Sequence, residues 1–225
     1  MKTIITFLSL AMAFTLVAQE NDTRKLSSFN EIRVSEGIDL VAQKGDDNSI
    51  SIEVSRIDIE DVITEVRGGK LYVHLSRGNH RSNKVRATLT YTEELKEIEV
   101  NTGAQAEFRT EISVSRLSVT SSTSGYVRLV AKAEEVDLSA TTSGRIDIDG
   151  TTDELEATAS TGGTIYAYDL TSNSAYARAN TGADVRINAE RRLRASAGTG
   201  GSVRYTGSPR TDVRSNTGGS VRRGG

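Results

Sequence analysis

The stretch NTGADVRI (180–187) returns as GTGGSVRY (198–205) and again as NTGGSVRR (216–223), at intervals of eighteen residues. Looser versions of the same unit lie upstream, and the first glycines of the seven Thr/Ser-Gly corners are Gly103, Gly125, Gly144, Gly162, Gly182, Gly200 and Gly218. The intervals between these glycines are 22, 19, 18, 20, 18 and 18 residues. A fixed period near twenty residues is typical of a protein built from stacked repeats.

In each unit, apolar and polar residues alternate both before and after the corner. Ala175 and Ala177 precede one corner, and Val185 and Ile187 follow it, with polar residues between them. Period-two alternation predicts strands with one buried face, and glycine permits the sharp bend at the corner. The sequence therefore predicts an all-β fold. We expect a single-stranded, right-handed parallel β-solenoid with 18–20 residues per coil, its strands about 4.8 Å apart.

The chain divides into segments by pattern. Residues 1–18 read as a signal peptide, with Lys2 before an apolar run that is shorter than the ~20 residues a membrane span needs. Residues 19–27 are expected to form a flexible leader and residues 28–225 the solenoid. Within it, 28–98 hold irregular coils with one helical turn in 56–66, and 99–225 hold the regular repeats.

The signal peptide predicts export to the periplasm, the cell surface or the medium. No transmembrane segment is expected after its cleavage. The 225 residues include no cysteine, so packing and backbone hydrogen bonds must hold the fold together.

Charge is distributed unevenly along the chain. The net charge is −2, yet the segment from Arg186 onward holds nine arginines against Glu190 and Asp212, a balance of +7. The preceding 185 residues therefore sum to −9. A basic end on an acidic body indicates either an anionic partner or head-to-tail association, and no nucleic-acid motif accompanies it.

Several motifs together resemble one family. They are the pattern F-x-x-I-x-V-x-x-G-I-D-L from Phe29, ITEVRGGKLYVHL (63–75), the Thr/Ser-Gly corners and YTGSP (205–209). In order and spacing they resemble the auto-transporter adhesin "head GIN domain" family of bacterial envelope proteins, over essentially the whole chain after the signal peptide. The resemblance implies an exported, non-enzymatic β-solenoid with no established ligand.

The residues give little support to catalysis. The two histidines, His74 and His80, lack motif partners, and there is no cysteine nucleophile. Asp147 and Asp149 lie on one face of a predicted strand and could bind Ca²⁺ or act as acid and base. We instead interpret Asp147 as part of an alternating ladder with Glu107 and Arg128 on neighbouring coils. No catalytic residue, metal site or cofactor is predicted.

The candidate ligand-binding residues form one outward column. In each strand that follows a corner, the same outward position is occupied in turn by Glu107, Arg128, Asp147, Tyr166, Arg186, Arg204 and Arg222. The strip Tyr166, Arg186, Arg204 and Arg222 is the predicted site, with Tyr166 close enough to Arg186 for a cation–π contact. The arginines could instead form a solvated face, offset by acids such as Asp212, or protect an open sheet edge.

These observations favour a non-catalytic binding or adhesion module of the bacterial envelope. Its expected partner is an anionic polysaccharide or another envelope component, such as a protein. The alternative is a structural module that self-associates through its solenoid ends, and the less favoured alternative is a β-helix enzyme acting on polysaccharide.

Overall fold

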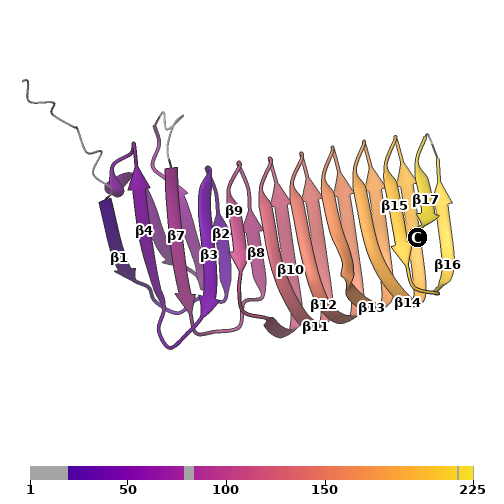
Figure 1. Ribbon diagram of the computed structural model, residues 1–225, viewed down its shortest axis with the longest axis horizontal. Coiled ribbons are helices and arrows are strands. Elements are labelled where there is room, and N and C mark those ends of the chain that lie inside the picture. The colour runs from indigo at the N-terminus through magenta and orange to yellow at the C-terminus, as the bar shows by residue number, and fades with distance from the viewer. Residues whose placement is uncertain (1–19, 79–83, 217, 225) are drawn as a thin grey trace, which may run out of the picture.

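The computed structural model describes residues 20–78, 84–216 and 218–224, and it shows a flattened β-solenoid of about seven turns. Its coils lie side by side along the long axis, with their corners along one edge (Figure 1). Within the described residues the one helical element is the 3₁₀ turn η1 (Ile59–Asp61), where the sequence predicts a helical turn. The proposed signal peptide, residues 1–18, lies outside the described residues.

The regular coils are formed by long strands, of which the first begins at a bend and the other four each run from one corner to the next. They are β10 (Ile112–Ser122), β11 (Tyr126–Thr141), β12 (Arg145–Ser160), β13 (Thr164–Asn180) and β14 (Asp184–Gly198). The last coils are formed by β15 (Ser202–Thr206), β16 (Arg210–Ser215) and β17 (Ser220–Arg223). All of these strands pair in parallel, as predicted. The right-handed sense of coiling stays a prediction.

Each coil contributes one segment to each of two facing β-layers. We call the layer of segments that follow the corners the departure face, and the layer of segments that lead into them the approach face. Coil lengths differ slightly, and bulges at the bend opposite the corners absorb the difference. Between β13 and β14, for example, the register shifts twice, at Ala167/Thr171 and at Ser172/Ser174.

The corners are tight turns with two left-handed residues each. The described threonines have φ between 48° and 52°, and they are Thr102, Thr123, Thr142, Thr161, Thr181 and Thr199. The next residue is also left-handed, as at Gly182 (φ 72°), and the following amide closes the turn, as in Ala183 N to Asn180 O at 3.2 Å. Two consecutive positive φ values define a type I′ turn.

Two of the predicted corner glycines have a different role. Ser124 and Ser143 take the left-handed position (φ 62° each), so Gly125 and Gly144 lie one residue later than the sequence pattern suggests. A Cβ on Gly125 would lie 2.3 Å from the carbonyl oxygen of Val100, and a Cβ on Gly144 would lie 2.2 Å from that of Ser121. These two glycines are needed for close approach between coils rather than for positive φ.

Hydrogen bonds between corners stabilise this strained backbone. The amide of Gly162 donates to the carbonyl of Thr181 at 3.0 Å, and the amide of Gly182 donates to that of Thr199 at 3.1 Å. A left-handed β-branched residue is unfavourable by itself. The stack of turns offsets that cost, because each corner supplies an acceptor to its neighbour.

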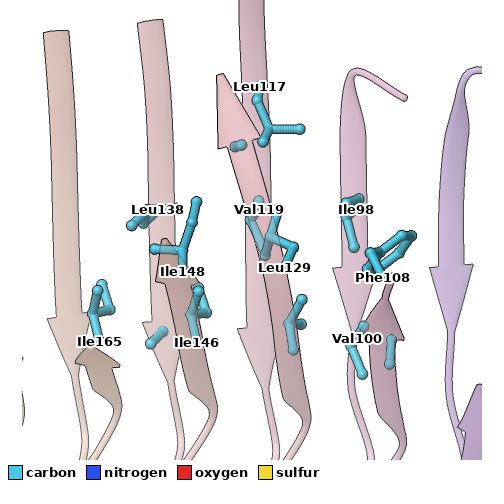
Figure 2. Packing of buried hydrophobic residues seen from close by; sticks show 14 of the residues in the cluster. Ile98, Val100, Phe108, Leu117, Val119, Leu129, Leu138, Ile146, Ile148 and Ile165 are labelled. Atoms are coloured by element: carbon cyan, nitrogen blue, oxygen red, sulfur yellow. The ribbon is translucent and has the colours of Figure 1, made fainter. Parts of the chain in front are cut away.

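The core is a narrow apolar layer between the two faces. Inward residues of successive coils, such as Ile98, Val119, Leu138 and Ile148, point into the space between the strands (Figure 2). Alanine fills many of the slots in the later coils, including Ala157, Ala177 and Ala195 on the approach face. The small side chains let the two faces lie close together.

The N-terminal strands complete the same sheet but do not stack in chain order. They are β1 (Glu20–Lys25), β2 (Glu31–Val34), β3 (Ile38–Lys44), β4 (Ser49–Ser55), β5 (Val62–Arg67), β6 (Lys70–Leu75), β7 (Lys84–Tyr91), β8 (Glu97–Val100) and β9 (Gln105–Phe108). The pair β2–β3 lies between β6–β7 and β8–β9. Contacts distant in sequence therefore set the order of the first coils.

The N-terminal end differs from the prediction in two respects. Residues 19–27 were predicted to be a flexible leader, but β1 pairs antiparallel with β4 along its whole length. The pairs β4–β7 and β5–β6 are also antiparallel, so the solenoid is not parallel throughout. Antiparallel strands at this end cover the edge that a parallel coil would leave open.

Candidate functional site

The predicted strip forms one column of the departure face. Tyr166 pairs with Arg186, Arg186 with Arg204, and Arg204 with Arg222. Each lies on the next coil, so their Cα atoms follow one another at the strand spacing, about 4.8 Å. The alternation in the sequence thus predicts their alignment correctly. Whether the column binds a ligand is a separate question.

Tyr166 lies between two arginine side chains. The guanidinium carbons of Arg145 and Arg186 each lie 4.4 Å from the centre of its ring, and Arg145 lies 5.5 Å from the ring of Tyr126. The cation–π contact between Tyr166 and Arg186 was predicted, and the one with Arg145 was not. Contacts of this kind fix long side chains in place and reduce the conformational entropy lost on binding.

Asp184 is the counter-charge of the strip. Its Oδ2 lies 2.8 Å from Nε of Arg186 and 3.5 Å from Nη1 of Arg204, and both arginine side chains are 29% exposed. Asp212 was the acid expected in this role, but it is on the approach face, with Arg194 at 3.3 Å and Arg214 at 4.0 Å. Asp184 precedes Arg186 by two residues, and this spacing places both side chains on one face of a strand.

Arg222 completes the column at the last coil. It is exposed and forms no ion pair within the described residues. Three arginines and Asp184 give the column a local charge of +2. The strip is therefore cationic, although two of its arginines are partly neutralised.

The residues considered for catalysis are engaged elsewhere or isolated. Arg145 holds Asp147 through two hydrogen bonds of 2.8 Å, and the hydroxyl of Tyr126 donates to Asp147 at 2.9 Å. The predicted ladder register of Glu107, Arg128 and Asp147 is confirmed, but Asp147 takes its ion pair from its own strand. His74 is half-buried beside Glu65, at 3.8 Å, and His80 lies outside the described residues.

Two kinds of feature are absent from the part of the chain that the structure describes. The described residues include no cluster of three or more His, Cys, Asp or Glu side chains placed to hold a metal ion. They also include no helix that is long and apolar enough to cross a membrane.

The approach face carries a groove that the sequence pattern does not predict. It has a volume of about 580 Å³ and lies between two rows of side chains that run across β11, β12, β13, β14 and β16. Row one is Glu135, Glu154, Ser174, Arg192 and Arg210. Row two is Asp137, Glu156, Tyr176, Arg194 and Asp212. The groove is acidic toward β11 and basic toward β16.

Together, the fold and these surfaces are those of a repetitive β-solenoid with charged side-chain ladders. The chain belongs to the family described as putative auto-transporter adhesin, head GIN domain, whose model matches residues 28–209. This confirms the resemblance seen in the sequence. No curated protein matches the chain.

Solved structures share the fold at low sequence identity. A putative adhesin from Bacteroides fragilis NCTC 9343 has a TM-score of 0.82 at 18% identity, and the match covers 92% of this chain and 97% of that one. A putative adhesin from Parabacteroides merdae ATCC 43184 has a TM-score of 0.76 at 17% identity, covering 92% and 96%. A structure called a putative lipid binding protein, from Parabacteroides distasonis ATCC 8503, has a TM-score of 0.69 at 19% identity, covering 92% and 97%.

Proposed function

We propose that the protein is an exported, non-catalytic adhesion-type module of the bacterial envelope that binds an anionic glycan through the strip Tyr166, Arg186, Arg204 and Arg222. The observation that carries the proposal is the register of three arginines on consecutive coils with Asp184 as their one acidic partner among the described residues. The family supports an adhesin-like role, and the signal-peptide pattern of residues 1–18 supports export.

The spacing of the strip suits a polymer rather than a small anion. Arginines repeat about every 4.8 Å along the solenoid axis, so a chain with regularly spaced carboxylate or sulfate groups would meet several guanidinium groups at once. Each guanidinium offers paired donors to an oxyanion. Tyr166 contributes by holding the guanidinium of Arg186 against its ring at one end of the strip, which orders that donor for an anionic group.

A non-catalytic role agrees with the engaged state of the carboxylates. Asp147 is tied to Arg145 and Tyr126, so one carboxylate of the pair Asp147 and Asp149 is already engaged in an ion pair and a hydrogen bond. A glycosidase needs two carboxyl groups that face each other across the scissile bond. The solved relatives named as adhesins point the same way.

The test is binding of the chain from Gln19 onward to dextran sulfate, with neutral dextran as the polymer control. We expect binding to dextran sulfate only, and a loss of affinity of about tenfold or more when Arg186, Arg204 and Arg222 are all changed to serine. A matched variant changes Arg178, Arg191 and Arg214 to serine, which removes the same charge away from the strip. Equal losses in both triple variants would show a general charge effect and overturn the assignment of the strip.

A further inference from the structure

The two rows of the approach face place like charges directly opposite one another. Glu135 pairs in register with Glu154, and Asp137 pairs with Glu156. On the other side, Arg192 pairs with Arg210. Like charges at directly opposed positions destabilise a sheet. Burial, together with the nearby carboxylate of Glu135, raises the pKa of Asp137. The monomer therefore carries an electrostatic cost on both sides of β13.

Little within the described chain relieves this cost. Glu135 is paired with Arg116, and Arg194 with Asp212. Glu154, Glu156, Arg192 and Arg210 form no ion pair with any described residue, although Arg192 contacts the hydroxyl of Ser174 at 3.3 Å. All four side chains are exposed. These two acidic and two basic side chains therefore lie on opposite sides of β13 on one surface, where each is available to a partner molecule.

The charges are arranged symmetrically about β13. Glu154 and Glu156 lie one strand to one side, on β12, and Arg192 and Arg194 lie one strand to the other side, on β14. Two strands away, Glu135 on β11 corresponds to Arg210 on β16. The uncharged Ser174 and Tyr176 occupy the centre, on β13 itself. A half-turn about an axis along β13 therefore exchanges three acidic positions with basic ones and one acidic position, Asp137, with another, Asp212.

We propose that the approach face binds a second copy of this chain, face to face, about a two-fold axis that runs along β13. In this arrangement Glu154 meets Arg192 of the second copy, Glu156 meets its Arg194, and Glu135 meets its Arg210. Each contact occurs twice because the interface is isologous. Tyr176 lies near the axis and faces Tyr176 of the second copy.

Different arrangements of the same surface are less favourable. A two-fold axis along the solenoid would place acidic side chains against acidic ones and basic against basic. In the proposed pairing one like-charged contact is left, between Asp137 and Asp212 of the second copy. Arg194 and Arg214 flank Asp212 within its own chain, which lowers the cost of that contact.

The expected dimer is weak and salt-sensitive. The surface spans five strands about 4.8 Å apart, so its area falls at the lower end of specific protein interfaces. The groove of about 580 Å³ leaves room for water between the facing rows. Exposed ion pairs of this kind are screened by salt. This contact uses the lateral surface of the coils, not the solenoid ends that the sequence suggests for self-association.

A charge-exchange experiment tests the proposal by sedimentation equilibrium of the chain from Gln19 onward. One variant carries Glu154→Arg and Glu156→Arg, and the other carries Arg192→Glu and Arg194→Glu. We expect the wild type to dimerise at low salt and each variant alone to be monomeric, because its new charges would face like charges. Mixing the two variants should restore a one-to-one dimer, because each exchanged side chain then faces an opposite charge.

Three outcomes would overturn the proposal: a monomeric wild type at high concentration and low salt, variants that dimerise like the wild type, or a mixture that stays monomeric. Circular dichroism of each variant checks that it is folded, and restoration on mixing itself requires two folded partners. The strip variant of Arg186, Arg204 and Arg222 should dimerise normally. Failure of the glycan proposal is thus distinguishable from failure of this one.

Cross-linking tests the position of the axis. The chain has no cysteine, so Tyr176→Cys introduces a unique thiol at the proposed axis. A short bis-maleimide should link two copies of this variant. The control is Thr164→Cys, on the departure face, which should give no link. Equal linking of both variants would contradict an axis along β13.

Discussion

At the scale of single residues, the backbone of the corners and bends depends on a few residues with positive φ. Thr181 and its five described counterparts adopt left-handed φ values, and neighbouring corners hold them there by hydrogen bonds. At the bend opposite the corners, Gly150 has φ 123° and lies against Ala131 of the previous coil.

Gly150→Ala should destabilise the fold strongly. The added Cβ would lie 1.9 Å from the carbonyl oxygen of Ala131, and alanine resists a φ of 123°. We expect a loss of about 2–4 kcal/mol in the free energy of unfolding. The control is Gly182→Asn, where φ is 72° and nothing lies within 4 Å of the added Cβ. It should cost less than about 1 kcal/mol in urea unfolding. Equal losses would contradict the close-packing explanation.

Asp184 should weaken the strip as an anion site. Changing Asp184 to Asn removes the carboxylate that contacts Arg186 and Arg204, which frees both guanidinium groups. Affinity for dextran sulfate should rise by about three- to tenfold. The control is Asp169→Asn, which removes the same charge from an exposed position on the neighbouring strand β13 and should have a smaller effect. Unchanged affinity in Asp184→Asn would mean that these arginines do not contact the polymer.

At the scale of elements, the N-terminal strands depend on charges that the repeat does not contain. Lys70 on β6 reaches Glu31 on β2 at 3.2 Å and Glu97 and Glu99 on β8 at 2.9 and 2.7 Å. Its side chain is 16% exposed. The cluster joins the three strands that are out of chain order, so it helps to specify their arrangement.

Lys70→Met should destabilise the protein at neutral pH by about 1–2 kcal/mol, because the three carboxylates would lose the cation that they share and, among the described residues, only Glu99 would keep an ion pair, with Arg33. Burial lowers the pKa of Lys70, but its hydrogen bonds to Glu99, Glu97 and Glu31 outweigh this and raise the pKa above 10.5. For Glu99, burial raises the pKa and Lys70 lowers it, with a net lowering from 4.5.

The sign of the pH dependence follows from these shifts. Stability from Glu99 is present above pH 4.5 and is lost as the pH falls through its lowered value, whereas that from Lys70 is lost only as the pH rises through its raised value. The wild type and Lys70→Met should therefore converge in melting temperature as the pH falls below 4.5. Lys132→Met, an exposed change on β11, should match the wild type at every pH.

Sequence reasoning succeeds where structure is local. Alternation and the Thr-Gly period place the strands, the inward residues and the column from Tyr166 to Arg222 correctly, since each follows from the same period-two rule. The order of β2–β3 and β6–β7 depends on pairing between distant segments, which no local pattern encodes. The sequence pattern places two corners one residue too late, because Ser124 and Ser143 take the left-handed position that it assigns to Gly125 and Gly144. The threonine before each corner is therefore the better guide to where the turn lies.

The site was predictable only in part for a related reason. Asp184 could have been found, because residues two apart on a strand share a face. The groove on the approach face could not, because its two rows align only once the bulges at each bend are known. Those bulges take up one or two residues per coil, and a sequence period cannot locate them.

At the scale of the whole molecule, one solenoid presents two charged surfaces with separate properties. The departure face concentrates arginines in one column toward the last coils, and the approach face separates acid from base across β13. Regular stacking turns a difference of one residue per repeat into a continuous ladder, so a family with one backbone can vary its ligands by changing outward positions alone. This separation lets the proposed glycan binding and the proposed self-association be tested independently.

The most direct test of the central claim is the affinity of the chain from Gln19 onward for dextran sulfate across a salt series, compared with the variant in which Arg186, Arg204 and Arg222 are serine. We expect affinity that falls steeply with salt in the wild type and a weak, nearly flat response in the variant. The same affinity and the same salt dependence in both proteins would contradict a binding role for the strip.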